Sequence, residues 1–152
     1  MRDRRSLAGI CLLLLAAVGC GGSGAGQDAI PKQFVKLPGG QQIQVEVVYK
    51  QADMARGMMF RDHLAPDRGM LFLHAEPGKY PYWMYNCKIA LDILWLDQSR
   101  RIAEMSANTP PCPGPASQCP QYGGNVPAQF VLELAAGMAE RYGLKLGDEI
   151  RF

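Results

Sequence analysis

Residues 90–96 are almost all apolar, β-branched or aromatic, and both sides of their strand alternation are apolar. One side holds Leu91, Ile93 and Trp95, and Asp92 lies among the apolar residues of the other side. A strand that is apolar on both faces is typical of an internal strand with protein above and below it. A carboxylate in that setting is costly unless it is paired or hydrogen-bonded, so the pattern predicts a partner for Asp92.

Shorter apolar runs, separated by glycine and proline turns, predict the other strands. Between residues 41 and 49 apolar side chains alternate with glutamine and glutamate, which is typical of a half-buried strand. Predicted strands cover residues 34–37, 41–49, 69–74, 80–85, 90–96, 101–105, 127–134 and 149–152, and predicted helical segments cover 50–59 and 137–142. About eight short strands and two short helices indicate a mainly β single domain, either a sandwich or a partly open barrel.

The first nineteen residues are predicted to be a targeting segment that takes no part in the fold. A basic start precedes an apolar run over residues 7–18. That run is too short for a bilayer-spanning helix, which needs roughly 17–25 residues. Small residues stand before Cys20, an arrangement that resembles the lipobox of bacterial lipoproteins. The alternative is an ordinary signal peptide with an incidental cysteine.

The lipoprotein interpretation divides the chain into three parts. Residues 1–19 would be removed as a signal peptide, and Cys20 would carry the lipid that attaches the protein to the membrane. Residues 20–33, which contain GGSGAG, would form a flexible tether to a domain over residues 34–152. Gly21 provides no inner-membrane retention signal, so we expect an exported lipoprotein at the outer membrane or its periplasmic face.

Charge gives little indication of a nucleic-acid partner. Without residues 1–19, lysine plus arginine falls from 16 to 13 and aspartate plus glutamate falls from 14 to 13. The remaining body is formally neutral and has no basic run, so it lacks the electrostatic footprint of nucleic-acid binding.

The cysteines predict one disulfide. Cys112 and Cys119 flank the sequence PGPASQ inside residues 108–125, a loop with five of the eleven prolines. An exported protein meets an oxidising compartment in which disulfides persist. We therefore predict a Cys112–Cys119 bond across this loop, and we interpret Cys87 as a small buried residue.

Four segments of the chain resemble a known family. They are MARGMMFRDHL, GMLFLHAEPGKYPYWMYN, ALDILWLD and PAQFVLELAAGMAERYGLKLGDEIRF. Together they resemble the domain of unknown function 192, a widespread bacterial and archaeal family, over nearly all of residues 34–152. The resemblance implies a mostly β single domain without an established activity. This chain has Cys87 where the family more often has threonine, and Lys50 where it more often has a capping residue.

A polar cluster with aromatic walls is the main candidate for a binding site. Its members are Arg56, Arg61, Trp83, Met84, Asn86 and Asp92. A guanidinium fork matches a carboxylate, so we expect an arginine to contact Asp92. A few polar groups among aromatic residues are typical of a small-molecule or sugar site. The alternative is that one Arg–Asp pair fixes the short helix on the sheet and nothing binds there.

Soft metal ligands provide a second hypothesis. The candidates are Met54, Met58, Met59, Met70, Met84, His63, His74 and Cys87. Thioethers suit Cu(I) in an exported protein. No pair has a recognised spacing such as CxxC or HxxxH, and methionine is also a common core residue. We therefore predict no metal and no cofactor, and copper binding stays an alternative.

Catalysis is a third hypothesis. Cys87 with His74 as base would need a lowered thiol pKa and an orienting partner. Glu133, Asp148 and Glu149 are interpreted as turn and solvated-face residues. We expect a lipid-anchored binding or interaction module for a small polar ligand or a segment of an envelope protein. The enzymatic alternative is a cell-envelope hydrolase or transferase with Asp92 as general base.

Overall fold

The structure is a computed structural model that describes residues 29–152. Cys20, the predicted signal peptide and most of the predicted tether lie outside the described residues. The strands are β1 Lys32–Lys36, β2 Gln42–Val48, β3 Arg68–Gly78, β4 Tyr82–Trp83, β5 Leu91–Leu96, β6 Ile102–Thr109, β7 Gln121–Tyr122 and β8 Ala128–Ala135. The helices are α1 Gln51–Arg56 and α2 Met138–Arg141, with a 3-10 turn, η1, at Ala116–Gln118. The predicted mainly β class with two short helices is confirmed.

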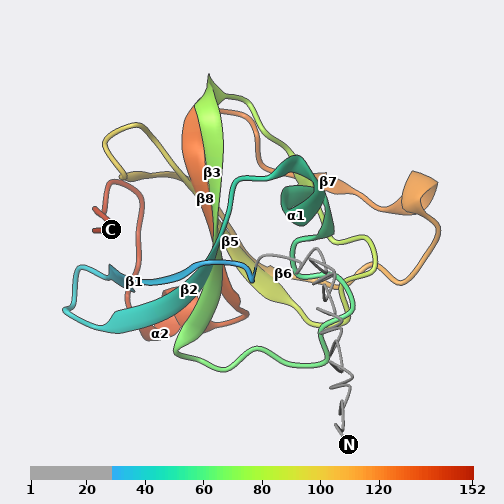
Figure 1. Cartoon of the computed structure of the whole chain (residues 1–152), viewed down its shortest axis with the longest axis horizontal. Helices are drawn as coiled ribbons and strands as arrows, with labels where there is room; N and C mark the ends of the chain where they lie inside the picture. The colour runs from blue at the N-terminus through green and yellow to red at the C-terminus, as the bar shows by residue number, and fades with distance from the viewer. Residues whose placement is uncertain (1–28) are drawn as a thin grey trace, which may run out of the picture.

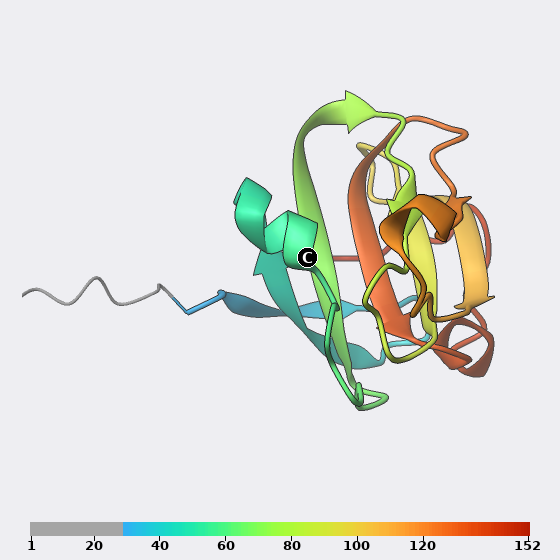
Figure 2. The same ribbon diagram turned by 90° about the vertical axis from the view of Figure 1, so that its right-hand side faces the viewer.

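Six of these strands form one mixed sheet in the order β1-β2-β3-β8-β5-β6, and β4 pairs with β7 in a separate ribbon. β2 and β3 are parallel, so the chain must cross over between them, and α1 lies in that crossover. The other neighbouring strands are antiparallel. Figure 1 shows β3 and β8 side by side through the middle of the molecule, with α1 to their right and α2 at the lower left. Figure 2 shows how strongly the sheet curves.

The predicted last strand, 149–152, is not a ladder strand of this sheet, and the prediction was wrong in that respect. Single bridges join Arg151 to Lys36 next to one sheet edge and Glu149 to Arg101 next to the other. The C-terminal segment therefore links the two edges without completing a ladder between them. Within residues 29–152 the barrel is not closed, which fits the predicted partly open form.

The two faces of the sheet carry two separate cores. The face toward α2 holds Leu94, Leu96, Leu132 and Leu134 among its buried residues, together with Ala139 of α2 itself. The opposite face holds Met58, Met70, Phe72, Met84, Cys87, Ile93, Trp95 and Val131. All six residues of β5 are buried. The alternation predicted for this strand, apolar on both faces, is confirmed.

Glycine ends α1 as the sequence suggests. Gly57 is its C-terminal cap, with φ 45°, a value that side chains with a Cβ adopt reluctantly. A Cβ at this position would stand 3.3 Å from the ring of Phe72 on the sheet. The glycine therefore lets the chain turn while it packs closely on β3.

The predicted disulfide between Cys112 and Cys119 is present. β6 extends to Thr109, so the loop begins later than predicted, and it contains the 3-10 turn and β7. This loop projects from the right side of the molecule in Figure 1. Because β7 pairs with β4, the loop is connected to the face of the sheet that carries α1.

Candidate functional site

Asp92 is fully buried on the face of the sheet toward α2. Its Oδ1 accepts the backbone N–H of Asn108 and its Oδ2 accepts the backbone N–H of Ala139, both at 2.7 Å. Ala139 belongs to the first turn of α2, whose N–H groups have no acceptor inside the helix. The carboxylate therefore fixes α2 and the end of β6 to β5. Both oxygens are engaged by backbone groups, in place of the arginine that the sequence suggested.

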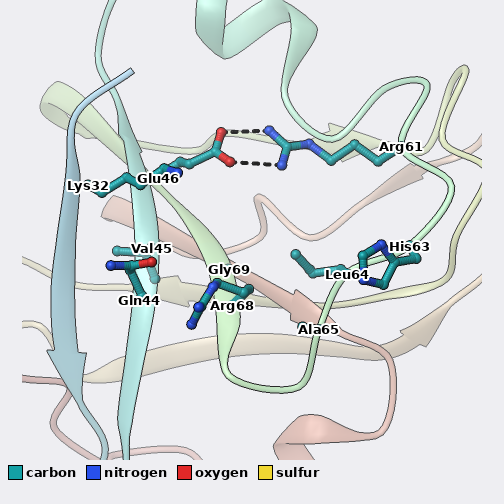
Figure 3. Close-up of a pocket in the computed structure, with 10 residues that line it drawn as sticks. All are labelled: Lys32, Gln44, Val45, Glu46, Arg61, His63, Leu64, Ala65, Arg68 and Gly69. Atoms are coloured by element: carbon teal, nitrogen blue, oxygen red, sulfur yellow. Dashed lines mark hydrogen bonds and ion pairs between the residues drawn. The ribbon is translucent and has the colours of Figure 1, made fainter. Parts of the chain in front are cut away.

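Arg61 is paired with a different carboxylate. Its Nη1 and Nη2 donate to Oε1 and Oε2 of Glu46 on β2, at 2.9 and 2.6 Å. Figure 3 shows the guanidinium reaching from the connection after α1 to β2. The hydrogen bonds with Arg61 hold the pKa of Glu46 below its usual range, and those with Glu46 raise the pKa of Arg61.

The concavity beside this ion pair has a volume of about 270 Å³ and is lined by Lys32, His63 and Arg68 as well as the pair itself. Arg68 forms a salt bridge with Asp67, with 2.7 Å between its Nη1 and Oδ2 of the aspartate. Two of its cationic side chains thus already have carboxylate partners. We regard the concavity as a weaker candidate than the cavity described next.

A narrow cavity of about 40 Å³ lies between α1 and the sheet, and we call it the methionine slot. Its lining includes Met54, Met58, Met59, Tyr82, Trp83, Tyr85, Cys87 and Glu133, together with Arg56. A cavity needs roughly 10–15 Å³ to hold one water molecule, so the slot has room for a single small occupant. It brings together two residues of the predicted cluster, Arg56 and Trp83.

The other members of that cluster have different positions. Met84 is fully buried, and its carbonyl accepts the N–H groups of Cys87 and Cys112 at 3.0 and 3.2 Å. Asn86 has φ 56°, and its carbonyl accepts the N–H of Phe60 at 2.9 Å. Both residues shape the wall behind Trp83 through their backbones.

Glu133 is a functional candidate that the sequence analysis missed. It was interpreted as a solvated residue, but only 4% of its surface is exposed. Its Oε2 is buried and has no hydrogen-bond partner among residues 29–152. Burial raises the pKa of Glu133 to about 8, although the positive charge of Arg61 opposes the rise. The group is therefore a mostly neutral acid at pH 7.

Glu133 could have been found by the argument that was used for Asp92. It stands inside the run Phe130 to Ala135, which is apolar on both sides of the alternation. An acid in such a run is buried whichever face it takes.

Cys87 lies beside Glu133 in the slot and is the free cysteine of the described residues. Burial raises its thiol pKa to about 12, and the negative charge of Glu133 acts in the same direction. The thiol is protonated, which makes it a poor nucleophile. The ring of His74, the base proposed for Cys87, stacks on the ring of Tyr80. The Nε2 atom of His74 lies 3.1 Å from the hydroxyl oxygen of Tyr82.

Partly exposed aromatic side chains belong to the lining of the slot, and Phe60 follows directly after Met59 of that lining. Trp83 is 41% exposed, and its ring centroid lies 5.1 Å from that of Tyr85. Phe60 is 55% exposed and has φ 66°, a conformation that costs energy for a bulky residue. Exposed aromatics next to a concave, partly polar cavity are typical of a binding surface.

In the part of the chain from Ala29 to Phe152, no three side chains of histidine, cysteine, aspartate or glutamate come together as a metal site. None of the helices in that same part has the length and apolarity that a bilayer crossing requires.

Comparison with known proteins gives a family and a fold. A crystal structure of a protein of unknown function from Novosphingobium aromaticivorans DSM 12444 is 29% identical and has a TM-score of 0.74, over 84% of this chain and 89% of that one. A crystal structure of a candidate transcription regulator from Sinorhizobium meliloti 1021 is also 29% identical with a TM-score of 0.74, over 83% of this chain and 97% of that one.

Curated proteins give no significant match. Residues 34–152 match the family DUF192, which is described as "Uncharacterized ACR". This match spans every strand from β2 to β8, both helices and all residues of the methionine slot. The chain therefore belongs to the DUF192 family.

Proposed function

We propose that this chain is a binding module of the cell envelope, tethered through a lipid on Cys20, with the methionine slot as its ligand site. One observation carries the proposal: the slot is lined by Glu133, whose Oε2 finds no partner in residues 29–152. Buried polar groups in folded proteins are nearly always hydrogen-bonded. A buried acid facing a cavity is therefore suited to meet a ligand.

The surroundings of the slot suggest how a ligand is held. A small polar group enters the slot toward Glu133, and a flat or apolar part of the same ligand lies against Trp83 and Tyr85 at the opening. Arg56 adds a cationic side chain on the same wall. A few polar groups that fix orientation among aromatic walls are the usual composition of small-ligand sites.

Binding is favoured over the hydrolase or transferase alternative. A general base must reach the proton that it removes, whereas both oxygens of Asp92 accept buried backbone N–H groups. Cys87 is protonated, which removes the nucleophile of the remaining catalytic hypothesis. A nucleic-acid ligand is not proposed, because the predicted mature body carries equal numbers of acidic and basic residues.

A thermal-shift screen of the full chain tests the ligand site. The probes are monosaccharides, small carboxylic acids, amino acids and tripeptides. A ligand of the slot raises the melting temperature by mass action, and Trp83→Ala abolishes the rise. Phe34→Ala is the matched control, because Phe34 is an exposed aromatic residue on β1. Phe34→Ala should keep the full rise. The proposal fails if no probe raises the melting temperature, or if Trp83→Ala keeps the rise as Phe34→Ala does.

The lipid anchor has its own test. Mass spectrometry of the N-terminal peptide from the native host should show diacylglyceryl modification of Cys20. Cys20→Ser should move the protein from the membrane fraction to the soluble fraction. An unmodified Cys20 in a soluble protein would contradict the anchor and leave the slot proposal standing.

A further inference from the structure

The methionine slot contains an unusual concentration of sulfur. Met54, Met58 and Met59 from α1 and the turn after it line the same small cavity as Cys87. Met58 and Cys87 are 2% and 6% exposed and belong to one buried cluster. Methionine alone would be ordinary core packing. The cavity is lined by these side chains, so the four sulfur-bearing residues border a space as well as packing in the core.

A second observation points to a cation in that space. Glu133 lines the slot, and only 4% of its surface is exposed. Its Oε2 lacks a hydrogen-bond partner in the described chain. A carboxylate is an acceptor with two oxygens, and a bound cation satisfies such a group fully. The slot volume of about 40 Å³ suits one ion better than an organic molecule.

We propose that the methionine slot binds one Cu(I) ion, with Cys87 and the thioethers of Met54, Met58 and Met59 as its sulfur ligands and Glu133 as the adjacent negative charge. The inference rests on the proposed function, since it names the occupant of the same slot. Thiolate and thioether ligands select Cu(I), whereas carboxylates and waters suit Mg²⁺, Ca²⁺ and Mn²⁺. Zn²⁺ is disfavoured, because its sites use cysteine and histidine rather than thioethers.

The structure changes which residues this copper hypothesis involves. His63 lines the concavity beside Arg61, and His74 stacks on Tyr80, so neither histidine lines the slot. Met70 and Met84 are buried in the neighbouring core and do not line it either. The sulfur ligands that remain come from α1, the turn after it and Cys87.

Binding needs no oxidant or reductant beyond what keeps copper in the Cu(I) state. The S–H bond of Cys87 breaks, a Cu–S bond forms, and the proton leaves to solvent. The carboxyl of Glu133 also gives up its proton to solvent as the ion enters, which leaves its negative charge beside the ion. The electron pair stays on sulfur, and no atom changes oxidation state. Metal binding of this kind releases one proton for each thiol that becomes a ligand.

The test is a competition titration of the full chain in detergent, with ascorbate as reductant and bicinchoninate as a coloured Cu(I) chelator. Every form carries Cys11→Ser and Cys20→Ser, so that Cys87 is the free thiol beside the Cys112–Cys119 disulfide. We expect the protein to withdraw one equivalent of Cu(I) from the chelator. Cys87→Ser should weaken binding by at least the ~10- to 100-fold that loss of an outer-shell partner costs a metal site.

Two methionine variants separate ligation from packing. Met58→Leu/Met59→Leu removes slot thioethers, and Met70→Leu/Met84→Leu removes buried thioethers outside the slot. Leucine and methionine exchange with little cost in cores, so both variants should fold. The first should weaken Cu(I) binding and the second should not. Failure to withdraw Cu(I), or equal losses in the two variants, overturns the inference.

The same preparations distinguish this inference from the proposed function. If Cu(I) is not bound but an organic probe still raises the melting temperature through Trp83, the copper inference fails and the binding module stands. If Cu(I) binds as expected and no organic probe does, copper is the ligand of the slot and the small organic ligand of the proposed function is ruled out. If neither binds, both proposals fail.

Discussion

The two faces of the sheet each bury one carboxylic acid, and the two acids are treated differently. Asp92 on β5 pairs in register with Leu134, and its neighbour Ile93 pairs with Glu133 on β8. The acids thus stand one register position apart on opposite faces. Asp92 accepts two backbone N–H groups, whereas Oε2 of Glu133 has no partner from Ala29 onward.

This difference distinguishes an acid with a structural role, Asp92, from the acid of the proposed ligand site, Glu133. A buried carboxylate with both oxygens engaged fixes the groups that donate to it and has nothing left for a ligand. A buried acid without a full set of partners lowers stability, and such a cost is typical of sites that have another use. The face toward α2 is therefore a scaffold, and the face toward α1 is the one on which we propose the ligand site.

Removal of Asp92 should have the largest effect. Asp92→Ala deletes two charge-assisted hydrogen bonds, worth about 1.5–3 kcal/mol each, and leaves the buried N–H of Ala139 and the partly buried N–H of Asn108 without this acceptor. We expect the free energy of unfolding to fall by about 3 to 6 kcal/mol in urea denaturation. If the free energy of unfolding falls by less than about 1 kcal/mol, the carboxylate does not hold α2 in place, and the structural role given to Asp92 is wrong.

Glu133 should show the opposite behaviour, as a pH-dependent cost. Its pKa is raised to about 8 in the folded protein, from an ordinary value of 4.5. Between these values the unfolded chain releases the proton while the folded chain keeps it. The free energy of unfolding therefore falls as the pH rises from 4.5 toward 8, by on the order of 3 kcal/mol at pH 7.

Glu133→Gln isolates this contribution, because glutamine has nearly the same shape and no titrating proton. The variant should be more stable than the unmodified chain at pH 7.5, and the two should converge near pH 4.5. Urea unfolding at both pH values measures the difference in the free energy of unfolding between the variant and the unmodified chain. The contributions of other titrating groups are the same in both proteins and cancel. A constant difference across that range would contradict a raised pKa for Glu133.

The sequence was sufficient for the scaffold face and insufficient for the other face. Alternation placed Asp92 correctly inside β5 and among apolar neighbours, because strand periodicity determines which face a residue takes. It could not identify the partners, since Asn108 and Ala139 donate through their backbones. Backbone donors have no signature in the side-chain pattern.

The slot depended on contacts between distant segments. Met58, Cys87 and Glu133 come from a helix end, a turn and a strand, and no spacing relates them. The sequence suggested soft ligands by residue type but could not say which of them meet. Charge alone suggested one of the two arginines near α1, Arg56 or Arg61, as the partner of Asp92, whereas Arg61 pairs with Glu46 on β2.

The disulfide should affect the slot face more than the scaffold face. A bond that closes a short loop typically contributes about 2 kcal/mol, so reductant should lower the melting temperature measurably. The loop carries β7, which pairs with β4 at Trp83 and Gln121. Hydrogen exchange after reduction should therefore increase at Tyr82 and Trp83 more than at Leu94 and Leu132. Cys112→Ser/Cys119→Ser should not respond to reductant, and an unchanged melting temperature in the unmodified chain would contradict the bridge.

Arg61 provides the smallest and most selective change. Its positive charge opposes the rise in the pKa of Glu133, so Arg61→Gln should raise that pKa further. The pH at which the free energy of unfolding stops falling should then move upward. The variant also loses the partly exposed ion pair with Glu46, worth less than about 1 kcal/mol. Glu46→Gln is the matched control, because it breaks the same ion pair while the guanidinium stays. Urea unfolding from pH 6 to 9 should show an upward shift for Arg61→Gln alone. Equal shifts in both variants would mean that the ion pair, rather than the charge of Arg61, sets the titration of Glu133.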